Sequence, residues 1–201
     1  MSHVKTDKVS ARTASGTITL GESGETFSLP SGATLNIASG ATISNAGTAS
    51  GFGKIVQYVQ TTSNTSGSTT SVIPEDGSIP QNTEGYELFT ASITPTSATN
   101  KLLITSSVAF AANGVCRLLI CLFQDSTADA LAVSDVVSSG SNQGGTGALA
   151  YWMDAGTTSS TTFKIRIGPT AGTCYFGRKS TVDPFFGGTM QHNFTIIEYA
   201  V

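Results

Sequence analysis

The sequence has few charged residues and few of the motifs that enzymes share. Charged residues make up 11% of its 201 residues, less than half of the usual share of about 25%. It has two histidines and no Gly-x-Ser-x-Gly elbow, no His-Glu-x-x-His helix and no phosphate loop ending in Gly-Lys-Ser/Thr. Catalysis needs titratable groups gathered in a pocket, so we predict no catalytic residue, no metal site and no cofactor.

Carboxylates offer the one enzymatic alternative. A glycan hydrolase or lyase would need two of them flanking a sugar bond. The candidates all lie in expected turns or strand ends, where Asp often binds its own backbone. The segment from Asp125 to Asp129 also lacks the dense oxygen ligands of a calcium loop. The candidates are Glu75, Asp76, Asp125, Asp129, Asp135, Asp154 and Asp183.

Long apolar runs and an apolar signal segment are also missing. No run approaches the roughly 18 residues of a membrane span, and the segment from Met1 to Lys8 has no apolar core. We therefore expect no membrane contact and synthesis in a cytoplasm. The net charge of −3 and the pI near 5.2 argue against a nucleic-acid partner, because phosphate binding needs a basic patch.

The three cysteines, Cys116, Cys121 and Cys174, form neither a metal spacing nor an even set for disulfides. Cys116 and Cys121 lie five residues apart in an apolar stretch, so a strand would place them on opposite faces. We expect all three to be small core side chains. A disulfide to Cys174 is the alternative.

Small residues are abundant and form a repeat. Ser-Gly recurs every eight residues, beginning at Ser15, Ser23, Ser31 and Ser39. After the last three of these dipeptides the sequence reads x-Thr-apolar-polar, which alternates with a period of two. This pattern predicts short strands separated by turns.

A unit of eight residues cannot form a core by itself, because each copy supplies so few large apolar side chains. Such repeats are stabilised by stacking on neighbours, and the short period predicts neighbours from other chains. We therefore predict an intertwined trimeric β-helix or β-prism shaft over residues 16–52, with a flexible Ser/Gly-rich linker as the alternative. The side chains expected at the trimer axis are Phe27, Leu29, Leu35, Ile37 and Ile43.

A basic arm precedes the repeats. The first 14 residues carry a formal charge of +2 and the rest of the chain −5. A basic arm on an acidic body can dock on an acidic surface. We expect residues 1–15 to form a docking arm with Lys5, Lys8 and Arg12 as contact residues; a frayed terminus is the alternative.

Residues 53–201 show longer strands with turns rich in Gly, Ser and Asn. Residues 115–124 are apolar on both faces, so we expect them to be covered on both sides, within a sandwich or at a trimer contact. Polar loops are expected at 62–85 and 138–147, the second of them mobile. The pattern predicts an all-β chain with an antiparallel, jelly-roll-like β-sandwich head. The expected strands are 55–61, 86–94, 101–112, 115–124, 130–137, 148–153, 162–167, 173–176 and 194–200.

Aromatic residues are the best candidates for binding. Tyr151, Trp152, Phe185 and Phe186 could offer flat rings to a sugar or a protein, because aromatic rings supply a large contact area at low entropic cost. Phe185 and Phe186 are adjacent in a loop, where both rings cannot easily point inward. The alternative is that these rings fill the sandwich or a trimer interface.

Two segments resemble a known family. Residues 53–60, Gly-Lys-Ile-Val-Gln-Tyr-Val-Gln, and residues 91–104, Ala-Ser-Ile-Thr-Pro-Thr-Ser-Ala-Thr-Asn-Lys-Leu-Leu-Ile, look like the opening of a β-sandwich module common in tailed-bacteriophage fibre and spike proteins. The octads resemble the shaft of the same trimeric appendages. The resemblance covers most of residues 16–110 and is one of pattern. It implies a homotrimer on a virion surface.

Two functions fit this resemblance. In the first, a non-enzymatic trimeric spike decorates or cements a phage capsid, and its N-terminal arm binds coat subunits. In the second, a short tail fibre or tailspike binds a bacterial surface glycan through the loops at 62–85 and 138–147. Both need a rigid threefold-symmetric protein. A cellular adhesin and a collagen-like secreted trimer are further alternatives, which the missing signal segment disfavours.

Overall fold

The computed structural model describes residues 26, 28–36, 38–39 and 55–201. The chain divides into two compact units, Met1–Ala49 and Ser50–Val201, which we treat separately. In the described part no helix is long and apolar enough to cross a membrane.

The first unit contains one of the expected turns. The amide of Ala33 donates a hydrogen bond to the carbonyl of Pro30 (3.0 Å), and Gly32 has a φ of +83°, which glycine adopts without strain. Residues 26, 28–36 and 38–39 hold no strand, so they do not show the predicted β shaft. The expected contact residues outside the described part are Lys5, Lys8, Arg12, Phe27, Ile37 and Ile43.

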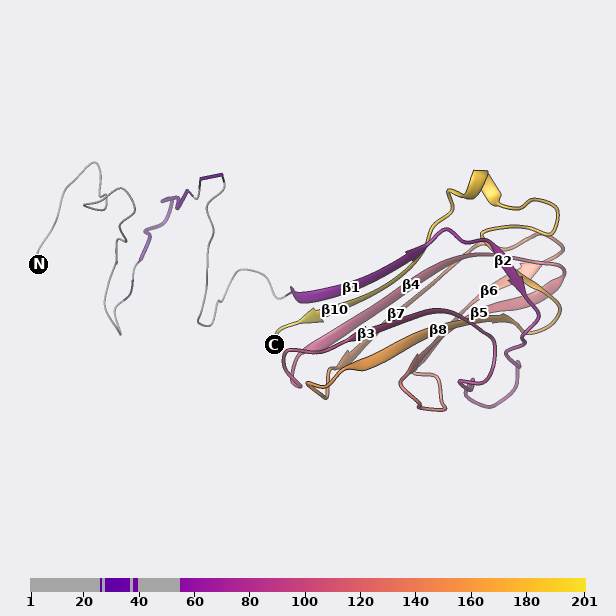
Figure 1. Cartoon of the computed structure of the whole chain (residues 1–201), viewed down its shortest axis with the longest axis horizontal. Coiled ribbons are helices and arrows are strands. Elements are labelled where there is room, and N and C mark those ends of the chain that lie inside the picture. The colour runs from indigo at the N-terminus through magenta and orange to yellow at the C-terminus, as the bar shows by residue number, and fades with distance from the viewer. Residues whose placement is uncertain (1–25, 27, 37, 40–54) are drawn as a thin grey trace, which may run out of the picture. The chain divides into compact units, whose positions relative to one another are not determined.

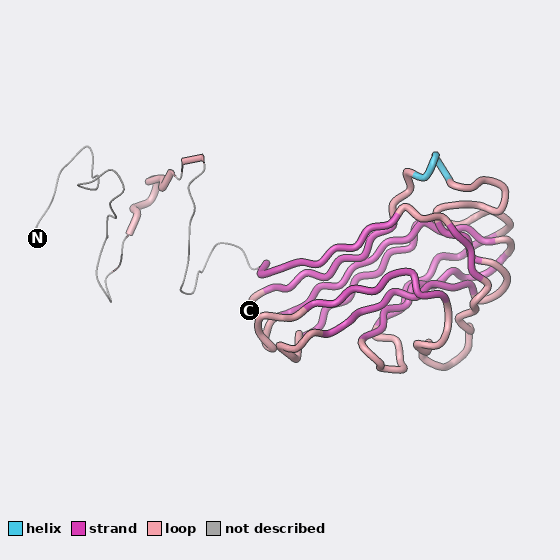
Figure 2. Tube along the Cα trace, in the orientation of Figure 1, coloured by secondary structure: helices cyan, strands magenta, loops and turns pink. Residues whose placement is uncertain are grey.

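The second unit, called the head here, is an antiparallel all-β structure, as the sequence predicts (Figures 1 and 2). Each predicted strand is present, with ends that shift by two residues at most. The segment 62–85, expected as a loop, also contains the three-residue strand β2. The elements are β1 (Ile55–Ser63), β2 (Gly67–Thr69), β3 (Tyr86–Ile93), β4 (Lys101–Ala112), β5 (Val115–Gln124), β6 (Ala132–Ser139), β7 (Thr146–Asp154), β8 (Thr161–Pro169), β9 (Cys174–Phe176), the 3-10 helix η1 (Phe185–Gly188) and β10 (His192–Tyr199).

The strands form two sheets that enclose the core. In the first sheet β10 and β7 flank β4, and β1 pairs with the far side of β10. The second sheet has the order β3-β8-β5-β6. The short strands β9 and β2 extend the first sheet beside the end of β4. The end of the head at which β1 begins and β10 ends is called proximal below, and the end that carries η1 is called distal (Figure 1).

The core follows the period of two that the sequence shows. Phe163, Ile165 and Ile167 on β8 are fully buried, while Lys164 and Arg166 point outward and pair with Glu87 of β3. Alternate side chains of β4 and β10 meet them from the first sheet. The apolar face of β8 is therefore the inward one, as the alternation of apolar and polar residues over 162–167 predicts.

Strand β5 is covered on both faces, as predicted. One face joins the main core, while Leu119, Cys121 and Phe123 form a second cluster with Ile73. Ile73 belongs to the polar segment 62–85, so this part of the chain lies on the outer face of the second sheet. A trimer contact is not needed to cover β5.

The cysteines are free side chains, not disulfides. Cys121 and Cys174 are fully buried, and burial raises the pKa of each thiol to about 12. Cys116 is partly buried and packs against the main core. The prediction of small core side chains is confirmed.

A buried carboxylate closes the proximal end of the head. Glu198 on β10 has no exposed surface and accepts hydrogen bonds from Gln57 Nε2 (2.6 Å), Asn100 Nδ2 (2.5 Å), Thr96 N (2.8 Å) and Thr96 Oγ1 (2.8 Å). Burial alone would raise its pKa, but these four hydrogen bonds outweigh burial and hold the pKa below its usual value. The carboxylate is therefore ionised and satisfied.

This network joins segments that lie far apart in the chain. Gln57 lies in the first of the two similar segments, residues 53–60, whereas Thr96 and Asn100 lie in the second, residues 91–104. Both segments converge on Glu198, which is near the other end of the chain. The two segments thus share a structural task, which is to close the sandwich around one carboxylate.

Acidification is expected to destabilise the head. Nδ1 of buried His192 accepts a hydrogen bond from the amide of Ala109 (3.2 Å), and burial lowers the pKa of His192. In the unfolded chain the His192 side chain binds a proton as the pH falls through about 6.5, whereas in the folded chain it stays neutral to lower pH. Glu198 likewise binds its proton at a higher pH in the unfolded chain, near pH 4.3, than in the folded one. Stability should be greatest above pH 6.5 and fall in two steps below it, by up to about 1.4 kcal/mol per pH unit for each proton.

Urea unfolding midpoints between pH 8 and pH 4 measure this loss. His192→Gln should be less stable at pH 8 but should lose the dependence between pH 7 and pH 5. A wild-type midpoint that stays constant from pH 7 to pH 4 would contradict the assignment.

Candidate functional site

The structure does not bring the four predicted aromatic contact residues together. Tyr151 and Trp152 lie on β7 near the proximal end, where Tyr151 points inward and packs against the core and Trp152 points outward. Phe185 and Phe186 lie in η1 at the distal end. The head therefore has two candidate surfaces, one at each end.

The proximal surface is a row of apolar side chains across four strands. Tyr58 of β1 pairs with Ile197 of β10, Ile197 with Leu103 of β4, and Leu103 with Trp152 of β7. All four side chains lie on the outer face of the first sheet. Tyr58 is 68% exposed and Trp152 56%, and the Trp152 ring packs on Tyr199 with centroids 5.2 Å apart. These five residues are called the proximal row.

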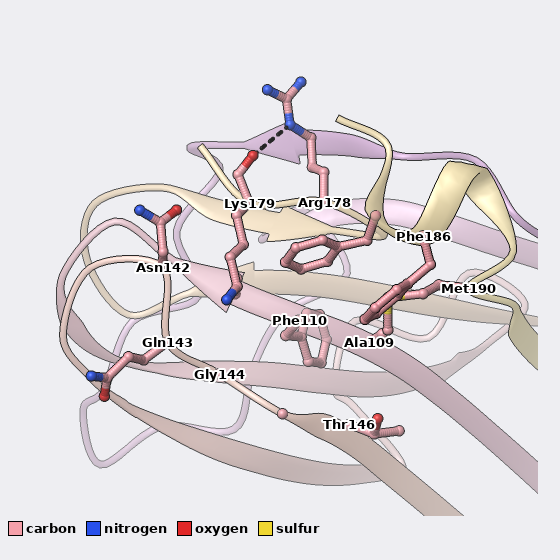
Figure 3. A pocket seen from close by; sticks show the side chains of 13 residues that line it. Ala109, Phe110, Asn142, Gln143, Gly144, Thr146, Arg178, Lys179, Phe186 and Met190 are labelled. Carbon is pink, nitrogen blue, oxygen red and sulfur yellow. Dashed lines mark hydrogen bonds between the residues drawn. The ribbon is translucent and has the colours of Figure 1, made fainter. Parts of the chain in front are cut away.

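The distal surface is a pocket of about 570 Å³. Its floor is the end of β4, one wall is the β6–β7 loop, and the other is the segment between β9 and β10 (Figure 3). The lining residues are Ala109, Phe110, Ala111, Asn142, Gln143, Gly144, Gly145, Thr146, Arg178, Lys179, Phe185, Phe186 and Met190.

Local backbone geometry shapes the wall of this pocket. The chain at Gly144 passes so close to β4 that a Cβ there would lie 2.3 Å from the carbonyl oxygen of Phe110, so only glycine fits. Asn142 has a φ of +60° and its Oδ1 accepts hydrogen bonds from the amide (2.8 Å) and hydroxyl (2.7 Å) of Ser180. The β6–β7 loop, predicted to be mobile, is thus tied to both neighbouring segments.

The pocket combines aromatic rings with positive charge. The Lys179 ammonium lies 5.0 Å from the centroid of the Phe185 ring, and Phe186, which is 75% exposed, lies beside Phe185 with centroids 5.6 Å apart. Arg178 forms an ion pair with Asp183, with Nη1 2.5 Å from Oδ2. None of the lining residues is acidic. The arrangement suits a ligand with a negative charge and an apolar face.

The candidate carboxylates are engaged in structural contacts. Asp125 accepts hydrogen bonds from the amide of Thr162 (2.8 Å) and the hydroxyl of Thr161 (2.9 Å), and Arg117 bridges Glu75 and Asp135. Hydrogen bonds from the hydroxyl and amide of Ser78 lower the pKa of Asp76. The remaining contacts pair Asp154 with Lys101, Asp183 with Arg178, and Asp129 with Gln81. Among the described residues no group of three His, Cys, Asp or Glu could hold a metal ion.

Sequence reasoning missed most of the proximal row, and at the distal pocket it missed the end of β4, Arg178, Lys179 and Met190. Tyr58, Leu103 and Ile197 are ordinary outward positions of separate strands, and only the strand register aligns them. Nothing in the sequence marks Lys179 as a contact residue either. Only the tertiary structure shows which Lys and Arg side chains pair with an acidic residue. A search for outward aromatic residues on period-two strands would have found Tyr58 and Tyr199 of the row, but neither Leu103 nor Ile197.

Comparisons with known proteins find a weak structural similarity and no match in sequence. No family model matches the chain, and no curated protein matches it. Among solved structures, the infectious bursal disease virus VP2 subviral particle is similar at 14% sequence identity and a TM-score of 0.30. The match covers 73% of this chain and 39% of the VP2 chain.

Proposed function

We propose that this chain is a non-enzymatic, homotrimeric structural protein of a bacteriophage virion surface, a spike-like capsid decoration or cement protein. Residues 1–15 would dock on coat subunits. The proximal row carries the proposal. Contiguous apolar side chains on the outer face of a sheet, two of them more than half exposed here, usually mark an interface with another protein.

Two further copies of the same chain are the partners that fit this row. The row lies at the end of the head where β1 begins, directly after residues 16–52 in the chain. Those octads lack the apolar side chains to form a core alone, and their described members Leu29 and Leu35 are exposed. Repeats that wind three chains together would hold three heads near one another at their proximal ends.

We also propose that the head is a jelly roll. The first sheet contains β1, β10, β4 and β7 and the second contains β3, β8, β5 and β6. The chain therefore crosses between the sheets repeatedly, which supports an architecture of two Greek keys. Capsid and lectin domains use this architecture, so it agrees with either virion role without deciding between them.

The proposal predicts a trimer that depends on the proximal row. Wild-type protein should sediment with three times the monomer mass of 20.6 kDa and co-sediment with capsids of its phage. The double variant Tyr58→Ser/Trp152→Ser should dissociate at least tenfold more readily, because each large apolar side chain contributes about 1.5–3 kcal/mol when buried.

The control is Val137→Ser. Val137 is 61% exposed and lies on β6 of the second sheet, away from the row, so trimer mass and capsid binding should be unchanged. A wild-type protein that sediments as a compact monomer would refute the proposal. Binding to tails instead of capsids would favour the receptor-binding role.

The distal pocket favours that second candidate, a short tail fibre or tailspike that binds a host-surface glycan. The predicted loop at 138–147 does line this pocket. The other predicted contact loop, residues 62–85, covers β5 instead. Of the two loops predicted to contact a glycan, only the one at 138–147 therefore lies at the pocket.

A further inference from the structure

Lys179 differs from the other cations of residues 55–201 because it has no acidic partner within that range. An ion pair compensates the positive charge of each of the others. Those pairs are Lys101 with Asp154, Arg117 with Glu75 and Asp135, Lys164 and Arg166 with Glu87, and Arg178 with Asp183.

The surroundings of Lys179 leave its charge directed at the pocket. Its ammonium lies 5.0 Å from the centroid of the Phe185 ring, a cation–π distance. Figure 3 shows the Lys179 side chain extending into the space above Phe110. No acidic residue lines the pocket, so the charged side chains of its lining are both basic although the whole chain carries −3.

The rest of the pocket suits a ring with one apolar face. Phe186 is 75% exposed and lies at the side of the pocket across from Lys179 (Figure 3), and Phe110 forms part of the floor. Asn142 and Thr146 add polar side chains at the rim. The volume of about 570 Å³ lies within the range of about 300–1,000 Å³ that small-molecule sites occupy.

We propose that the distal pocket binds an acidic sugar, a hexuronic-acid unit of a bacterial surface glycan. Its carboxylate contacts Nζ of Lys179 and the apolar face of its pyranose ring packs on Phe186. A charge-assisted contact of this kind is stronger than a neutral one, and aromatic rings give contact area at little entropic cost. The inference rests on the receptor-binding candidate but not on the trimer, since a single chain supplies every lining residue.

The test compares two tetrasaccharides by calorimetry on the full-length protein. One alternates glucuronic acid with N-acetylglucosamine, and the other is its carboxyl-reduced analogue, in which glucose replaces each glucuronic acid. The acidic probe should bind at least about tenfold more tightly than the analogue, as expected for one charge-assisted contact. Raising the NaCl concentration to 0.5 M should remove most of that difference.

Variants assign the contacts. Lys179→Gln should bind both probes equally, while Lys179→Arg should retain the preference for the acid. Phe186→Ala should weaken both probes by a similar factor. The matched control is Lys101→Gln, which removes a lysine at the proximal end and should leave both affinities unchanged.

Three results would overturn the inference: equal binding of the two probes by wild type, full affinity of Lys179→Gln for the acidic probe, or tighter binding of an acidic peptide than of the acidic sugar. Adsorption of labelled protein to host cells distinguishes a failure of the acidic-sugar inference from a failure of the receptor-binding role. If cells are bound while Lys179→Gln binds them equally well, the receptor role stands and the acidic-sugar site does not.

Discussion

Replacing Glu198 by alanine is expected to lower the free energy of unfolding by about 3 kcal/mol, because each buried donor without an acceptor costs about 1–3 kcal/mol. The four hydrogen bonds that Glu198 accepts come from Gln57, Thr96 and Asn100. With the carboxylate removed, Asn100, which is 5% exposed, loses this acceptor within the core, and Gln57 and Thr96 lose theirs nearer the surface. Urea unfolding at fixed protein concentration and pH 7 measures the loss.

Two further substitutions separate the carboxylate from side-chain volume. Glu198→Gln keeps the shape but directs an amide NH₂ at neighbouring donors, so we expect about 2 kcal/mol of destabilisation. Glu75→Gln removes a carboxylate whose side chain is 60% exposed and pairs with Arg117, and should cost less than about 1 kcal/mol. A Glu198→Gln protein as stable as wild type would show that the network contributes nothing.

Replacing Phe194 by alanine should cost about 3–5 kcal/mol, the usual loss for a fully buried phenylalanine. Phe194 on β10 has no exposed surface and packs on Phe89 of β3, with ring centroids 6.1 Å apart. The pair connects the two sheets through the core. The variant should unfold at a much lower urea concentration, with a transition that remains cooperative.

The matched control is Phe186→Ala. The same side chain is removed from the distal surface, where it is 75% exposed, so we expect a loss below about 1 kcal/mol. If the two substitutions destabilise equally, the core does not lie where the structure places it.

Most strands of the head could be predicted because period-two alternation is a local property. Phe163, Ile165 and Ile167 are separated by polar residues, and this pattern alone gives both the strand and its buried face. The short strand β2 was missed because its sequence, Gly-Ser-Thr, contains no large apolar side chain, whereas the equally short β9 contains Tyr175 and Phe176. Ile73 was missed for another reason, since a single apolar residue in a polar segment gives no sign of the surface it covers.

The candidate surfaces could not be predicted in the same way. The proximal row depends on the register of three strand pairs, and a shift of one residue in any strand would turn its member toward the core. Leu103 and Trp152 illustrate this point, because they lie on the same outward patch only through the pairing of β4 with β7.

By itself the sequence determined that the head is all-β, which side chains of β8 face inward, and that the cysteines are small core side chains, because each follows from the local order of polar and apolar residues. Only the tertiary structure decided which residues meet across strands and loops. It placed Tyr58 in line with Trp152, joined Gln57 and Asn100 through Glu198, and left Lys179 without an acidic partner among residues 55–201. These contacts join residues far apart in the chain, and their formation depends on strand register and sheet order, which local patterns do not encode.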